Sequence, residues 1–183
     1  MLVLITGFGL SFYLFSLLGN VFIPLGLLIW VIIFTDLVWK DKQKSFIIIV
    51  AIGGLFYEML FLYYFFTNIT IVGSMRGSID AEYRNFVIVF LMLGLIFFVI
   101  TGLIFAREIF KTKSTEYKMR AKFLFAAFIS YFVGASLDGI KPFIFEVSFL
   151  DFVYIVNRII LISAAVEFYC GFNLPKWIKN RFS

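Results

Sequence analysis

The sequence predicts an all-α membrane protein, a single domain of residues 1–183 built as a bundle of about six transmembrane helices with both termini cytoplasmic. Hydrophobic residues make up 63% of the chain and charged residues only 15%, whereas an average soluble domain is about 45–50% apolar and about 25% charged. The apolar residues form long runs, and most basic residues gather in alternate connections. A soluble fold of this size could not cover so much apolar surface.

Six stretches are long enough for helices that cross a bilayer, which need about 20 residues each. The first has no basic start and no cleavage site of a signal peptide, so we interpret it as a helix. Gly19-Asn20 and Pro24 predict a tight turn into the second stretch. An alternative is that the chain derives from a longer architecture that has lost a preceding helix. The predicted spans are Leu2–Leu18, Phe22–Trp39, Phe46–Phe66, Phe86–Ile109, Phe123–Leu137 and Phe149–Phe172.

The basic residues predict the orientation, because positive side chains are retained on the cytoplasmic side. Twelve of the 16 lie in three segments that share one side if there are six spans. Trp39 and Trp177 flank these segments, as interfacial anchors do. We expect this face to meet anionic lipid, and no nucleic acid, since the charges are split among three segments. The basic face comprises Lys40, Lys42, Lys44, Arg107, Lys111, Lys113, Lys118, Arg120, Lys122, Lys176, Lys179 and Arg181.

The composition also excludes several kinds of chemistry. The chain has no histidine, which removes Ser-His-Asp hydrolysis, His-ligated zinc and haem held by histidine. The single cysteine, Cys170, cannot form an internal disulfide or a cysteine cluster for a metal. No glycine-rich phosphate-binding motif occurs. We therefore expect no metal, no cofactor and no enzymatic activity.

Two ionisable residues are predicted to lie deep in the membrane, where an unpaired charge costs several kcal/mol. Glu58 is eight residues from the outer end of its span and Arg158 nine residues from the outer end of its own, which are depths of about 12 and 13 Å. Their matching depth predicts an ion pair. Three interpretations stay open: a structural clasp, a pair that gates or binds a ligand, and hydration or snorkelling without pairing.

The last span carries further polar residues. Asp151 and Tyr154 are predicted to share the helix face of Arg158, because they precede it by seven and four residues. Asn157 can form a hydrogen bond across a helix interface. Glu167 falls on the opposite face near the cytoplasmic end, and we expect it to pair with a lysine of a loop, although proton transfer is an alternative.

Small residues predict where helices approach closely. Ala126, Ser130 and Gly134 recur at every fourth position of the fifth span, and Asp138 continues the stripe. Gly54 lies one turn before Glu58 and would let a partner helix come close to the acid. We interpret both features as helix packing rather than as a ligand groove.

The longest outer connection, residues 67–85, contains Gly73, Gly77 and the sequon Asn68-Ile69-Thr70. Glycines are typical of turns. The sequon matters only in a host that glycosylates, and it lies close to the membrane.

Four runs in the second half of the chain carry a resemblance to known proteins: Arg107–Lys113, Lys118–Lys122, Phe132–Asp138 and Gly171–Trp177. This part, about 80 residues, resembles the six-to-eight-helix membrane-integral sensory regions of prokaryotic, especially archaeal, signalling proteins, and it gives no catalytic residue. The resemblance implies a sensory protein. Such regions usually precede a cytoplasmic output domain, which we do not expect in this chain.

Three functions are compatible with these features. The first is a non-enzymatic sensory or partner-binding protein of the cell membrane, most simply a prokaryotic plasma membrane, with a membrane protein or a second copy as partner. The second is a small transporter or channel subunit that uses Glu58 and Arg158, or an accessory subunit of a larger membrane complex. A lipid-modifying enzyme is the weakest, because no nucleophile and base are seen together.

Overall fold

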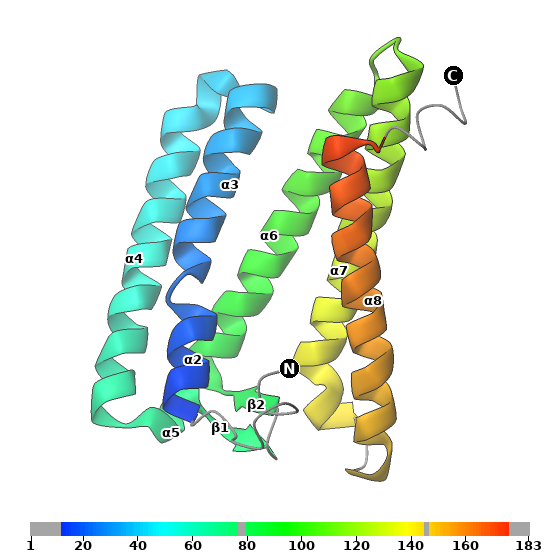
Figure 1. Cartoon of the computed structure of the whole chain (residues 1–183). Coiled ribbons are helices and arrows are strands. Elements are labelled where there is room, and N and C mark those ends of the chain that lie inside the picture. The colour runs from blue at the N-terminus through cyan, green and yellow to red at the C-terminus, as the bar shows by residue number, and fades with distance from the viewer. Residues whose placement is uncertain (1–11, 77–79, 145–146, 176–183) are drawn as a thin grey trace. The chain divides into compact units, whose positions relative to one another are not determined.

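The computed structural model describes residues 12–76, 80–144 and 147–175, most of them helical (Figure 1). The chain divides into two units that meet between Gly94 and Leu95, inside helix α6 (Asn85–Phe110). The described residues contain five helical segments long and apolar enough to cross a membrane, so this is a helical membrane protein. These segments are Phe12–Val38, Lys40–Thr67, Asn85–Phe110, Thr115–Gly139 and Phe152–Asn173.

The first unit is built on two long antiparallel helical segments. One segment consists of α2 (Phe12–Asn20) followed by α3 (Ile23–Val38), and the other is α4 (Gln43–Thr67). The short 3-10 turn η1 (Lys40–Lys42) connects them. Successive residues of α2 and α3 meet residues ever nearer the start of α4. The pairs are Tyr13 with Phe65, Asn20 with Tyr57, Pro24 with Gly54 and Ile32 with Gln43.

The predicted reversal of the chain at Gly19-Asn20 and Pro24 is therefore wrong. The helix breaks at Val21 and Phe22 and then continues in the same direction (Figure 1). Pro24 stands in the first turn of α3, where a helix does not need the N–H that proline lacks. The count of six spans is not confirmed, since the described residues supply five and residues 2–11, most of the first predicted span, lie outside them.

The predicted outer connection contains secondary structure of its own. After α5 (Ile69–Val72), strands β1 (Gly73–Arg76) and β2 (Asp80–Tyr83) pair antiparallel, with Gly73 opposite Tyr83. Position 73 requires glycine, because a Cβ there would collide with the carbonyl oxygen of Glu82. In the sequon, the hydroxyl of Thr70 donates to Oδ1 of Asn68 at 2.6 Å. The all-α prediction therefore holds apart from this small hairpin.

Aromatic packing fills the first unit beside the hairpin. Tyr57, Phe61 and Phe65 lie on the buried face of α4 together with Val72 of α5. The ring of Tyr57 stacks on Phe90 in the first turns of α6, with centroids 3.8 Å apart. These contacts join α4, α5 and the start of α6.

The second unit contains the rest of α6 with α7 (Thr115–Ile144) and α8 (Val147–Asn173), and α7 and α8 lie side by side (Figure 1). Phe128 of α7 is fully buried, and its ring meets Phe168 of α8 edge-on at 4.9 Å. A Cβ at Gly171 would lie 2.6 Å from Cγ of Leu124. The two helices are therefore in close contact at this end, and the last three predicted spans fall within the observed helices.

Candidate functional site

The middle of the α7–α8 interface depends on a small residue. A Cβ added at Gly134 would lie 2.7 Å from Cδ2 of Leu161 and 3.4 Å from Oδ1 of Asn157. A larger side chain at this position would require the Leu161 side chain of α8 to shift. The two earlier residues of the predicted packing stripe are less buried than Gly134: Ser130 is half-buried and Ala126 is exposed.

Four residues form what we call the polar cluster of the second unit: Asp138, Tyr154, Asn157 and Arg158. Nδ2 of Asn157 donates to Oδ1 of Asp138 at 2.9 Å. Nη2 of Arg158 lies 3.6 Å from the same carboxylate oxygen. The guanidinium carbon of Arg158 is 4.5 Å from the centre of the Tyr154 ring, which is within the range of a cation–π interaction.

The direction of helical side chains explains why Arg158 reaches Asp138. Arg158 lies 11 residues after Val147, where α8 begins, so it is about 16 Å along the helix. Side chains on a helix lean toward its N-terminus. Arg158 therefore leans toward the end of α8 that lies beside the last turns of α7, and Asp138 lies six residues before the end of α7 at Ile144.

The polar cluster is only partly shielded. The side chain of Arg158 is 39% exposed and that of Asp138 is 35% exposed, although Asn157 is fully buried. Two of its polar atoms, Nε of Arg158 and Oδ1 of Asn157, are buried without a hydrogen-bond partner among the described residues. The cluster thus joins α7 to α8 and still presents a charged edge at membrane depth.

Glu58, the predicted partner of Arg158, lies on α4 in the first unit, whereas Arg158 belongs to the second. Its Oε2 atom is buried without a hydrogen-bond partner among the described residues. Gly54, one turn earlier, packs against Pro24 of α3, since a Cβ there would be 3.0 Å from Cβ of that proline. The Glu58–Arg158 pair stays a prediction, and the ion pair of Arg158 among the described residues is with Asp138.

The other predicted polar residues of α8 have separate surroundings. Oε1 of Glu167 accepts a hydrogen bond from the hydroxyl of Ser163 at 3.2 Å, one turn earlier on the same helix. Lys40, a lysine of a connection between helices, lies 3.8 Å from Asp36 in an exposed pair. Asp151 lies in α8, but its side chain is outside the described residues.

The sequence did not predict a second cluster of buried polar residues, which lies in the first unit. Ser16, Asn20 and Tyr57 are at most 2% exposed. The hydroxyl of Tyr57 donates to Oδ1 of Asn20 at 3.2 Å, and Nδ2 of Asn20 donates to the carbonyl of Ser16 at 2.9 Å. Asn20 suggested a turn, because Gly-Asn is typical of turns. The spacing of Ser16 and Asn20, one helical turn, was the available signal for a helix instead.

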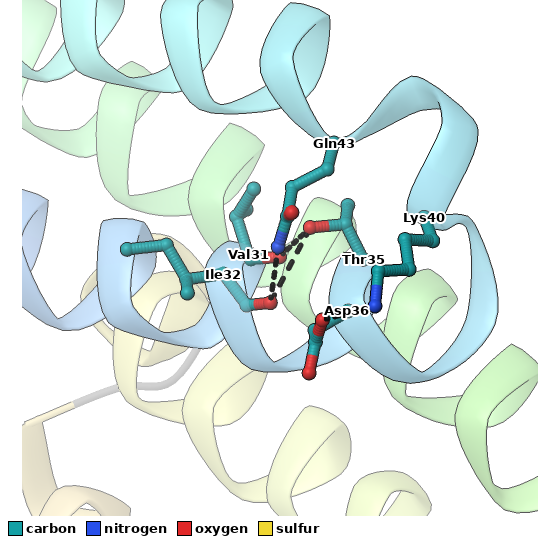
Figure 2. A network of polar contacts seen from close by, with 6 residues as sticks. All are labelled: Val31, Ile32, Thr35, Asp36, Lys40 and Gln43. Atoms are coloured by element: carbon teal, nitrogen blue, oxygen red, sulfur yellow. Dashed lines mark hydrogen bonds and ion pairs between the residues drawn. The ribbon is translucent and has the colours of Figure 1, made fainter.

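Polar side chains also hold the corner between α3 and α4 (Figure 2). Nε2 of Gln43 at the start of α4 donates to the carbonyl of Ile32 at 3.3 Å. The hydroxyl of Thr35 donates to the carbonyl of Val31 at 2.6 Å. We interpret this corner as structural, because its side chains bond to the backbone or to each other and do not point toward a common binding site.

The basic face is not uniform. Arg120 is structural: Nη2 contacts Oε1 of Glu116 at 2.9 Å, and Nη1 donates to the carbonyl of Phe172 at the end of α8 at 2.7 Å. Lys42 lies 6.0 Å from the Trp39 ring. Lys44, Lys113 and Lys118 are exposed, and Lys176, Lys179, Arg181 and Trp177 lie outside the described residues.

Within the described residues, no group of three or more Asp, Glu or Cys side chains is placed to hold a metal ion. The arrangement thus offers charge pairing and hydrogen bonding in an apolar setting. Comparison with known proteins finds no matching family model, no matching curated protein and no matching solved structure. The resemblance to prokaryotic sensory regions stays a prediction.

Proposed function

We propose that this chain is a non-enzymatic, multi-pass protein of the cell membrane that acts by binding a partner within the membrane, and that the polar cluster of the second unit is the contact. One observation carries the proposal. Arg158 and Asp138 keep 39% and 35% of their side chains exposed, and both lie inside long apolar helices, α8 and α7. In lipid such exposure is unfavourable, so a protein surface that covers it gains stability from the contact.

The energetics favour a protein partner over lipid at this edge. An unpaired arginine at the centre of a membrane helix costs about 2.5–3.5 kcal/mol. Asp138 offsets part of that cost through a contact of 3.6 Å. A neighbouring helix with a carboxylate, carbonyl or amide acceptor would offset more of it, as polar groups between membrane helices do.

The surface beside Arg158 has the character of a helix-binding face. Ile155, Ile159, Ile162 and Val166 on α8 are all more than half exposed. The partner would therefore meet an apolar strip with one charged edge. We propose another membrane protein or a second copy of the chain as the occupant, which makes this chain an accessory or sensory subunit.

The proposed orientation places the basic segments in the cytoplasm. With the five described spans, the connections at Lys40–Lys44 and Arg107–Lys122 still share one side, which the positive-inside rule favours as cytoplasmic. The β-hairpin connects the second and third described spans, so it lies on the opposite side of the membrane. Phe12 would lie on that side as well, because its ring is 6.5 Å from the ring of Tyr83 in the hairpin. This differs from the six-span prediction only at the N-terminal end.

The experiment compares association in native membranes. The tagged chain is extracted with its surrounding lipid in polymer nanodiscs, and the protein mass of each disc is measured. Wild type should carry additional protein mass, and Arg158→Leu should lose it. Arg84→Leu, which removes an exposed arginine of the connection after β2, should keep it. Equal mass for wild type and Arg158→Leu would refute the proposed contact.

Glu58 supports a second candidate, a transport subunit. A carboxyl group at membrane depth with a buried oxygen that lacks a hydrogen-bond partner among the described residues is typical of ion or proton pathways. Glu58→Gln should then abolish ion flux in proteoliposomes. Flux that survives both Glu58→Gln and Arg158→Gln would exclude this use of the residues.

A further inference from the structure

We propose that the basic end of α6 and α7 binds one anionic phospholipid in a defined groove, a site separate from the polar cluster of the proposed function. The groove has a volume of about 790 Å³. Arg107, Phe110 and Lys111 line it on the α6 side, and Lys122, Phe125 and Ile129 line it on the α7 side. All of these residues belong to the second unit.

The charges of the groove lie at the level where the apolar sequence ends. Arg107 follows the long apolar run of α6, and Lys122 directly precedes the run of α7 that starts at Phe123. Because α6 ends and α7 begins at this same end of the unit, both cations mark the boundary between hydrocarbon and headgroups. A lipid phosphate lies at that boundary in any bilayer.

Two of the three cations are available to a ligand. Lys111 contacts Oε1 of Glu108 at 2.6 Å. Arg107 and Lys122 have no ion-pair partner among the described residues, and both are exposed. Two such cations fit one phosphate with a net negative headgroup, since arginine supplies paired donors and lysine a point charge.

Below the charges the groove is apolar. Phe125 is 48% exposed and Ile129 is 43% exposed, and they follow Lys122 at one and two turns along α7. Ala126 lies between them and lines the same groove, and its small side chain leaves the space open. An acyl chain fits this apolar part, whereas a free phosphate would use only the charged end. The order of charge above and hydrocarbon below therefore assigns the groove to a phospholipid.

The test uses the full chain in phosphatidylcholine vesicles with a trace of spin-labelled lipid. Electron paramagnetic resonance gives the association constant of labelled phosphatidylglycerol relative to labelled phosphatidylcholine. Wild type should prefer the anionic lipid, and Arg107→Gln/Lys122→Gln should reduce the preference by about tenfold. The matched control Lys113→Gln/Lys118→Gln removes equal charge from the same connection outside the groove and should change it less than about twofold. Equal effects of the two double variants, or no preference in wild type, would overturn the proposal.

A second pair of variants distinguishes lipid binding in the groove from general electrostatic attraction of anionic lipid to the basic surface. Ala126→Trp fills the groove without changing charge, so it should remove most of the preference. Val133→Trp, at an exposed position of α7 outside the groove, should leave it intact. An unchanged preference in Ala126→Trp would refute a built site. Inorganic phosphate, compared with chloride at equal ionic strength, should not displace the labelled lipid, and full displacement would assign the site to a free anion instead.

These outcomes do not depend on the proposed partner. Lys122 lies near the start of α7, whereas Asp138 lies toward the end of that helix. Arg158 lies beside Asp138, in the first half of α8. Loss of lipid preference with retained partner mass in nanodiscs would leave the proposed function standing. The reverse result would leave the lipid site standing.

Discussion

Replacement of Asp138 by leucine should destabilise the second unit mainly through Arg158. The carboxylate accepts from Asn157 at 2.9 Å and lies 3.6 Å from Arg158. Without it, Arg158 keeps only the face of Tyr154, 4.5 Å away, among the contacts that the structure gives it. The change therefore leaves a cation without its counter-ion at membrane depth.

The magnitude follows from the exposure of the pair. An unpaired arginine costs about 2.5–3.5 kcal/mol at a helix centre. Arg158 is 39% exposed and lies nearer one end of its span, so we take the lower limit and add about 0.6 kcal/mol for the lost interhelical hydrogen bond. Asp138→Leu should thus cost about 3 kcal/mol. Arg158→Leu should cost about 1 kcal/mol, because Asp138 keeps its hydrogen bond to Asn157.

The double variant tests the pairing. Asp138→Leu/Arg158→Leu removes both charges and should cost about 1 kcal/mol, which is less than Asp138→Leu alone, giving a coupling of about 3 kcal/mol. The assay is reversible unfolding of the full chain in mixed micelles, titrated with SDS and followed by the loss of helical circular dichroism. Additive costs of the two single variants would refute the pairing.

The same assay decides between the two partners considered for Arg158. A parallel cycle with Glu58→Leu and Arg158→Leu should show coupling below about 0.5 kcal/mol, the usual limit for independent sites. Stronger coupling with Glu58 than with Asp138 would establish the pair predicted from depth and refute the pair described above.

Three further predictions concern packing, the first unit and topology. Gly134→Ala should cost about 1–3 kcal/mol in the same unfolding assay, because its Cβ would lie 2.7 Å from Cδ2 of Leu161, whose side chain must then shift, whereas Gly53→Ala, with open space around it, should be neutral or stabilising. Tyr57→Phe removes only the hydrogen bond to α2 and should cost about 0.6–1.7 kcal/mol in that assay, and an unchanged stability would show that the bond contributes nothing. In a Cys-free background, Phe12→Cys and Lys113→Cys should react with a membrane-impermeant thiol reagent from opposite sides of the membrane, and labelling from one side would contradict the proposed topology.

The sequence predicted the later spans well because long apolar runs specify helices in a bilayer without help from other parts of the fold. Thus α4, α6 and α8 fall close to their predicted ranges, and α7 contains its predicted range but extends beyond it at both ends. The positive-inside pattern is likewise local, so it is compatible with either five or six spans.

The turn after the first predicted span was mispredicted because a helix break and a chain reversal give the same sequence signals. Gly19, Asn20 and Pro24 do interrupt the helix. Whether the chain then turns back depends on distant contacts, here the hydrogen bond between Tyr57 and Asn20 and the packing of Pro24 on Gly54. Single-sequence patterns contain no information on such contacts.

The polar cluster shows a similar limit. The predicted depth of the two residues suggested an ion pair between Arg158 and Glu58. Asp138 was predicted only as the end of a packing stripe. Helices joined by a short connection pack against each other first, and α7 and α8 are such neighbours. Weighing chain connectivity before depth would have favoured Asp138.

Site-specific photo-crosslinking at Ile162 tests the central claim, that the exposed edge of the polar cluster meets a protein partner, most directly. Ile162 is 64% exposed and lies one turn after Arg158 on α8. In native membranes a photoreactive residue there should form protein adducts, which disappear in Arg158→Leu, while the same group at Phe132 of α7 gives fewer. Lipid adducts alone at Ile162, or protein adducts that persist in Arg158→Leu, would contradict the account.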